Sequence, residues 1–271
     1  MQRKNLLLVY LIAIFTLVCE LCRQILFVVT SEVYFPFFLA ASISISFAAV
    51  IFRLFIIDPE KFTSVILETD IYGSNENSSD QSLNPVRFLN LMPIAMVTCS
   101  IADFLITIEF IAGVLTFFVA QILYIGAYSG IIHLNPKMLF TGKAKSLTFG
   151  SIIVWVFIAG TLYITLIYSP ADIMTLFVIP YVIVLTLMVI VTFFGFGYID
   201  RSIKFRLMLC GGGILFLVSD TILAYNRFNT TFYGAGIWIG ASYLLAVFML
   251  QYAMLCLRAP DGSSILISSS S

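Results

Sequence analysis

Eight long apolar runs are the feature that most limits what this sequence can fold into. A helix needs about 20 residues to cross the hydrocarbon core of a bilayer, and each run has that length. A segment inside lipid must satisfy its own backbone hydrogen bonds, which favours helices, and the alternating pattern of an outer-membrane barrel is absent. We therefore predict an all-α polytopic membrane protein, a bundle of about eight transmembrane helices. The predicted spans are residues 6–28, 34–57, 88–109, 111–132, 147–168, 173–198, 204–226 and 232–257.

The composition supports this class and excludes others. The chain is 61% hydrophobic and 10% charged, whereas a soluble domain carries about 25% charged residues. Its formal net charge is zero, so we expect membrane lipids and no nucleic acid as partners. Cys19 and Cys22 form a C-x-x-C in the first apolar run, but no second pair or histidine cluster joins them. We therefore expect no metal and no cofactor, and the sequence predicts no oligomeric state.

The basic residues predict the orientation. With a cytoplasmic N-terminus, twelve of the fourteen Lys and Arg residues fall on the inner side, and only Arg23 and Arg227 fall toward the outer side. The positive-inside rule then places both termini in the cytoplasm. Such a protein suits the plasma membrane of a prokaryote or the endoplasmic reticulum of a eukaryote.

The domain organisation follows from the polar stretches. Residues 1–258 form one transmembrane domain. Residues 58–87 are rich in Asn, Ser, Gly and acidic residues, which predicts a flexible cytoplasmic loop. Residues 259–271 are predicted to be a disordered tail.

Two aspartates interrupt the apolar runs. Asp103 lies in TCSIADFLITIEF (98–110) and Asp220 in LFLVSDTILAYNRF (215–228). Each lies in the third span of a group of four and at similar depth in the outer half of the bilayer, which suggests a parallel four-plus-four repeat. A carboxylate so deep is costly, so it should face the bundle interior, a polar cavity or a partner.

A pair of close carboxyl groups predicts hydrolysis. One acid of such a pair stays protonated and donates a proton, while the other accepts a proton from water. We therefore predict that Asp103 and Asp220 are catalytic. The alternative is that each aspartate only bonds a hydroxyl of a neighbouring helix and helps hold the bundle together.

Other polar side chains share the helix faces of these aspartates. Arg227 lies near the outer surface, where its guanidinium either meets a phosphate headgroup or simply extends to the interface. Glu20 and Arg23, near the outer end of the first span, are candidates for the same rim. The predicted polar stripes are Ser100, Asp103 and Thr107; Gln121, Tyr124 and Tyr128; and Asp220, Ala224 and Arg227.

At these residues the chain resembles the YhhN-like family of eight-helix membrane proteins, which includes lysoplasmalogenases. LFLVSDTILAYNRF is similar to the second signature of that family. The residues that carry this likeness are Ser219, Asp220, Leu223, Ala224, Asn226, Arg227 and Phe228. The first signature is similar to Ala102-Asp103, Gly113, Phe117 or Phe118, Gln121 and Tyr124, with Ala102 in place of a glycine and Gln121 in place of a histidine.

The resemblance implies hydrolysis of the vinyl ether bond of lysoplasmalogens without a cofactor, and hence a lysolipid substrate. It implies that Asp103 and Asp220 are catalytic. The substrate-binding residues expected beside them are Gln121, Tyr124, Asn226, Arg227 and Tyr243. The alternative is a non-catalytic lipid-binding protein or small-molecule transporter with the same fold, because intramembrane acids and repeated halves also suit a carrier.

Overall fold

The computed structural model of the chain describes residues 3–30, 35–58, 83–134, 139–140, 144–169, 172–197 and 201–257. Within these ranges the structure has helices and no strand, apart from single bridge residues at Ile57 and Leu83, and eight helices are long and apolar enough to cross a membrane, which confirms the predicted fold class. The elements are α1 (Arg3–Thr30), α2 (Phe35–Ile51), the π-helical turn η1 (Phe52–Ile56), α3 (Pro85–Ile108), α4 (Phe110–Tyr128), α6 (Ala144–Leu162), the π-helical turn η3 (Tyr163–Ile167), α7 (Met174–Phe177), α8 (Ile179–Phe196), α9 (Ile203–Phe228) and α10 (Ala235–Cys256).

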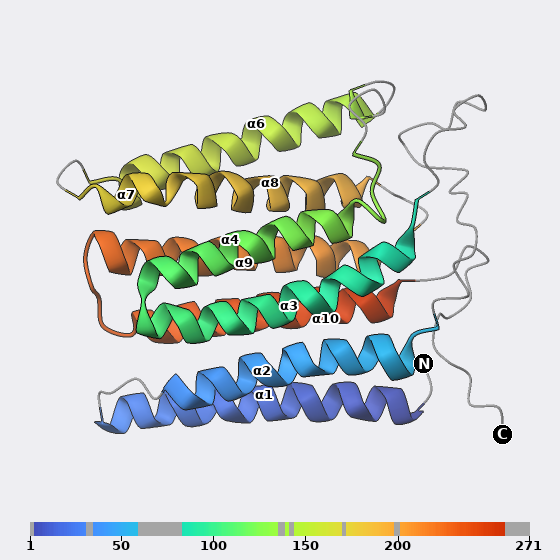
Figure 1. Ribbon diagram of the computed structural model, residues 1–271, viewed down its shortest axis with the longest axis horizontal. Coiled ribbons are helices and arrows are strands. Elements are labelled where there is room, and N and C mark those ends of the chain that lie inside the picture. Colours follow the sequence, from blue (N-terminus) through green and yellow to red (C-terminus); the bar gives the residue numbers. More distant parts are fainter. Residues whose placement is uncertain are drawn as a thin grey trace.

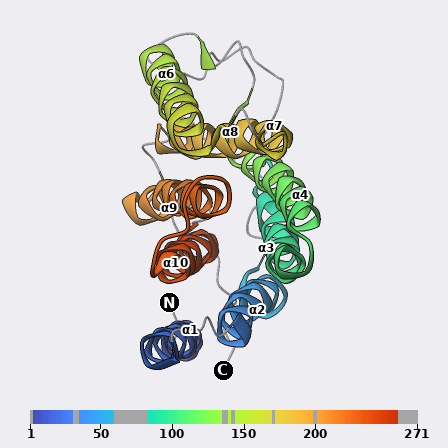
Figure 2. The same cartoon turned by 90° about the vertical axis from the view of Figure 1, so that its left-hand side faces the viewer.

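The helices form two facing rows, and a pair of helices lies across each end of these rows (Figure 2). Seen along the bundle, α9 and α10 lie opposite α3 and α4 (Figure 2). Helix α2 packs against α3 and α10 with α1 beside it, and α8 packs against α4 and α9 with α6 beside it. The contacts of α1, α2, α3 and α4 thus match those of α6, α8, α9 and α10, taken in that order. This arrangement agrees with the predicted four-plus-four repeat, which stays a prediction.

The ends of the chain agree with an even number of crossings. The start of α1 and the end of α10 lie at the same end of the bundle (Figure 1). Which side of a membrane this end faces stays a prediction. The predicted loop and tail fall largely on residues 59–82 and 258–271, which lie outside the described residues.

The helix boundaries differ from the predicted spans by a few residues, and two of the differences have a clear physical reason. Helix α3 begins at Pro85 and not at 88, because the Asn84 side chain accepts a hydrogen bond from the Arg87 backbone and proline is favourable in the first turn. The predicted loop 58–87 therefore ends three residues earlier. The predicted span 173–198 consists of two helices, α7 and α8, which meet at Val178 just before Pro180.

A tight hairpin places Asp103 beside α4. Glu109 ends α3 and begins α4, and its carboxylate accepts a hydrogen bond of 2.7 Å from the Ala112 backbone. The next residue, Gly113, lies so close to α3 that an added Cβ would be 2.5 Å from the Ile106 Cα. A larger residue would push the two helices apart, so the glycine fixes how closely α3 and α4 pack.

Candidate functional site

The two aspartates line the same cavity. It has a volume of about 220 Å³ and lies between α1, α2, α3, α9 and α10, with Phe117 of α4 in its wall. Asp103 is 3% and Asp220 is 8% exposed, so both carboxyl groups are buried. The bundle therefore brings together two residues that are 117 positions apart in the sequence.

Asp103 accepts two hydroxyl hydrogen bonds. Ser42 Oγ on α2 donates to Asp103 Oδ2 at 2.5 Å, and the Tyr243 hydroxyl on α10 donates to the same oxygen at 2.8 Å. Ser100 extends this network, because its hydroxyl lies 3.0 Å from Ser42 Oγ and 2.7 Å from Ser46 Oγ. The predicted stripe of Ser100 and Asp103 thus faces a row of serines on α2.

The Tyr243 hydroxyl is aimed at Asp103 by aromatic packing. The Tyr243 ring lies 5.6 Å from the Phe38 ring, 6.0 Å from the Phe117 ring and 5.4 Å from the Phe216 ring, measured between centroids. The last two contacts are edge-to-face, a preferred geometry for aromatic pairs. A ring held on several sides cannot swing its hydroxyl away from the carboxylate.

Asp220 has a different setting. The Tyr181 hydroxyl on α8 donates to Asp220 Oδ2. Gln121 on α4 is fully buried and lies close enough to the Tyr181 hydroxyl to interact with it. Neither polar atom of the Gln121 amide makes a hydrogen bond of good geometry within the part of the chain that the structure describes.

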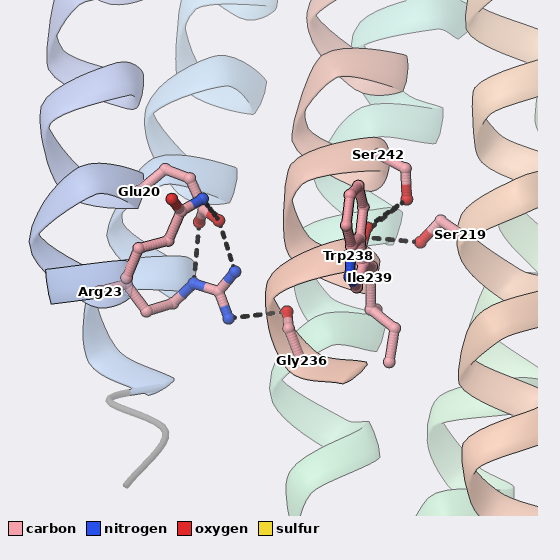
Figure 3. A network of polar contacts seen from close by, with 8 residues as sticks. Glu20, Arg23, Ser219, Gly236, Trp238, Ile239 and Ser242 are labelled. Carbon is pink, nitrogen blue, oxygen red and sulfur yellow. Dashed lines mark hydrogen bonds and ion pairs between the residues drawn. The ribbon is translucent and has the colours of Figure 1, made fainter. Parts of the chain in front are cut away.

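A buried ion pair on α1 forms part of the cavity wall. Arg23 binds Glu20 through two nitrogens, with Nε at 2.8 Å from Oε2 and Nη2 at 2.5 Å from Oε1. Arg23 also donates from Nη1 to the Gly236 carbonyl on α10 at 2.8 Å (Figure 3). Gly240 makes room for the guanidinium, because an added Cβ there would lie 2.3 Å from Arg23 Nη2. The cation of this cavity is therefore Arg23.

The residue before Asp220 joins α9 to α10. Ser219 is buried and donates from its hydroxyl to the Ile239 carbonyl at 3.1 Å (Figure 3). Since Ser219 and Ile239 both line the cavity, this bond fixes the wall from which Asp220 projects.

Four of the predicted substrate-binding residues lie outside the cavity wall. Gln121 and Tyr124 of α4 are buried in the core of the bundle, where the Tyr124 hydroxyl lies 3.8 Å from Cys99 Sγ. Asn226 accepts a long hydrogen bond from the Phe232 backbone, and the exposed Arg227 lies 5.3 Å from the Phe110 ring centroid. Tyr243 is the predicted substrate-binding residue that does line the cavity.

The sequence analysis missed Ser42 and Tyr181 as partners of the aspartates. A single hydroxyl in an apolar helix does not indicate which neighbouring helix it will contact. A weak signal existed for Ser42, because Ser42 and Ser46 are four residues apart and so share one helix face. For Tyr181 there was no signal beyond its position near the start of a span, beside Pro180.

The side chains present suit proton transfer and anion binding. No group of three or more His, Cys, Asp or Glu side chains in the described ranges could hold a metal ion. Cys19 packs in the hydrophobic core. The cavity offers two carboxyl groups, one tyrosine hydroxyl and one guanidinium in an otherwise mostly apolar wall.

Comparison with known proteins supplies one match. No curated protein and no solved structure matches the chain significantly. The model of the YhhN family matches residues 81–254, which run from just before α3 almost to the end of α10 and include both aspartates. The chain therefore belongs to the YhhN family.

Proposed function

We propose that the protein is a membrane-embedded hydrolase that cleaves the vinyl ether bond of lysoplasmalogen-type lysolipids. The products are a fatty aldehyde and a glycerophospho-headgroup. The observation that carries the proposal is that the buried side chains of Asp103 and Asp220 line the same cavity. Membership of the YhhN family, which is associated with this activity, supports it.

The proposed reaction needs one acid and one base. A protonated carboxyl group gives its proton to the vinyl carbon on the chain side of the double bond, which leaves an oxocarbenium ion. Water adds to the carbon that carries the ether oxygen and loses a proton to the other carboxylate. The hemiacetal then collapses: the second carboxyl group gives its proton to the glycerol oxygen as the carbon–oxygen bond breaks. The hemiacetal hydroxyl gives its proton to the first carboxylate as the aldehyde leaves, which restores the original acid and base. Glycosidases use two carboxyl groups for an oxocarbenium-like state in the same way.

The surrounding residues have matching roles in this proposal. The hydroxyls of Ser42 and Tyr243 hold the Asp103 carboxyl group, and the Tyr181 hydroxyl holds the Asp220 carboxyl group. Such fixed groups need little rearrangement when charge develops in the transition state. The N–H groups of Arg23 that are not used by Glu20 and Gly236 are available to a phosphate oxygen at the cavity wall.

The test is aldehyde release by the purified protein. We expect aldehyde from a lysoplasmalogen and no fatty acid from an acyl lysophospholipid with the same headgroup. The Asp103→Asn protein is the control, because it keeps the shape of the side chain and loses the acid. Tight binding of the intact lipid without any turnover would overturn the proposal and indicate a lipid-binding or transport protein.

A further inference from the structure

Asp220 lies in the wall between two cavities. Besides the cavity that it shares with Asp103, it lines a second one of about 40 Å³ between α4, α6, η3, α8 and α9. Ile106, Phe117 and Leu223 also line both cavities. The two spaces are therefore separated only by side chains that they share, and one of these is the Asp220 carboxyl group.

A third space continues from the second. A groove of about 280 Å³ lies between α6 and α8 and shares Ala159, Tyr163 and Val182 with the 40 Å³ cavity. Along the groove Val156 is 54% and Ile183 is 54% exposed, so the groove opens on the apolar outer surface of the bundle. The three spaces form a series from the aspartates to the surface that faces lipid.

The polarity falls along this series. The first cavity carries Arg23, Asp103 and Asp220, whereas no charged residue lines the groove between α6 and α8. In the 40 Å³ cavity the Tyr181 hydroxyl and the Asp220 carboxyl group form the polar side of an apolar wall. A ligand that fits all three spaces is polar at one end and apolar along the rest of its length.

We propose that the 40 Å³ cavity and the groove between α6 and α8 bind the single hydrocarbon chain of the lipid, while its polar end lies in the cavity of the two aspartates. This assignment rests on the proposed function for the identity of the lipid. The assignment places the vinyl ether bond, which joins the hydrocarbon chain to the glycerol, beside Asp220 and Tyr181.

The direction of the groove agrees with a chain in a bilayer. The α8 residues that line it run from Ile179 to Ile190, starting at the level of Tyr181 and ending past the middle of the helix. From Tyr181 to Ile190 the groove covers roughly 13 Å at about 1.5 Å per residue. A chain that enters beside Asp220 therefore runs along α8 into the hydrocarbon core.

Two glycines of α6 offer a matched test. Gly160 lines the groove, whereas Gly150 lies on the same helix away from it, and an added Cβ meets nothing within 4 Å at either position. We expect Gly160→Trp to raise KM for a long-chain lysoplasmalogen by about 10-fold, the scale of a misfit in a hydrophobic pocket. The same variant should raise KM less for a short-chain substrate, whose chain makes fewer contacts in the groove, and Gly150→Trp should leave both KM values unchanged. Equal KM values for Gly160→Trp and Gly150→Trp with the long-chain substrate would overturn the assignment.

A binding experiment keeps this inference separate from the proposed reaction. An acyl lysophospholipid with a diazirine at the end of its chain is cross-linked to the wild-type protein by light, and the labelled peptides are identified by mass spectrometry. We expect labels on α6 and α8 around Gly160 and Thr186, whether or not the protein hydrolyses vinyl ethers. Labels on α1 or α2 near Phe38, or no saturable label on α6 and α8, would overturn the chain path.

Discussion

Helices α1 and α6 occupy matching places in the two halves of the bundle but make different contacts with their neighbours. Each lies outside an inner helix, α1 beside α2 and α6 beside α8 (Figure 2). Helix α1 carries the buried pair Glu20 and Arg23 and is tied to α10 by the bond to the Gly236 carbonyl. Helix α6 leaves an apolar groove against α8. One side of the site thus carries charged residues and is tied to α10, while the other is apolar, which is the polarity that the proposed amphipathic lipid would need.

The largest effect is expected at the two aspartates, which lie between these sides. Asp103→Asn and Asp220→Asn should each lower kcat for lysoplasmalogen hydrolysis by at least about 10²-fold, because each removes a group that transfers a proton. Neither change should lower the thermal unfolding temperature in detergent by much, since asparagine still accepts the hydroxyl hydrogen bonds. Activity within a few-fold of wild type in either variant would contradict a reaction that needs both acids.

The polar side can be tested by comparing two arginines. Arg23→Ala leaves Glu20 buried without its cationic partner, with only the Gln24 amide still bonded to it among the described residues, and should destabilise the protein by about 3–5 kcal/mol. Arg227→Ala removes only an exposed cation near the Phe110 ring and should cost no more than about 1 kcal/mol. Thermal unfolding in detergent measures both changes. Equal effects would contradict a buried Arg23–Glu20 pair that contributes to stability.

The hydroxyl partners of the aspartates differ in number, which predicts a smaller difference in activity. Tyr181→Phe removes the one hydroxyl that donates to Asp220 within the described residues, so kcat should fall by about 10-fold. Tyr243→Phe leaves Ser42 on Asp103 and should lower kcat less. Tyr252→Phe, at a site away from both aspartates, is the matched control. A larger loss in Tyr243→Phe than in Tyr181→Phe would contradict this comparison.

The smallest effect is expected at Gln121. A buried amide without good hydrogen bonds is unfavourable by about 1–3 kcal/mol, so Gln121→Leu should leave the unfolding temperature unchanged or raise it. Because Gln121 lies behind Tyr181 and not in the cavity wall, activity should fall less than in Tyr181→Phe. A drop in both stability and activity would show that the amide has a partner in the working protein.

The sequence predicted the helices well because the bilayer imposes a length and a composition that can be read without tertiary structure. It also singled out Asp103 and Asp220, since a carboxylate is conspicuous in an apolar helix. Helix spacing placed Arg227 on the face of Asp220, but two further turns carry it past the end of the cavity, where it packs on Phe110. Which serine or tyrosine contacts each aspartate depends on how the helices rotate and pack. The residue pattern of a single sequence does not predict this rotation and packing.

The most direct test of the central claim is hydrolysis in D₂O with immediate chemical reduction of the aldehyde. Protonation of the vinyl carbon by a solvent-exchanged carboxyl group predicts one deuterium on the carbon next to the aldehyde carbon. This product should form with the wild-type protein and fall to the uncatalysed level with Asp103→Asn and with Asp220→Asn. Aldehyde without this deuterium, or no aldehyde from the wild-type protein, would contradict the two-aspartate hydrolysis.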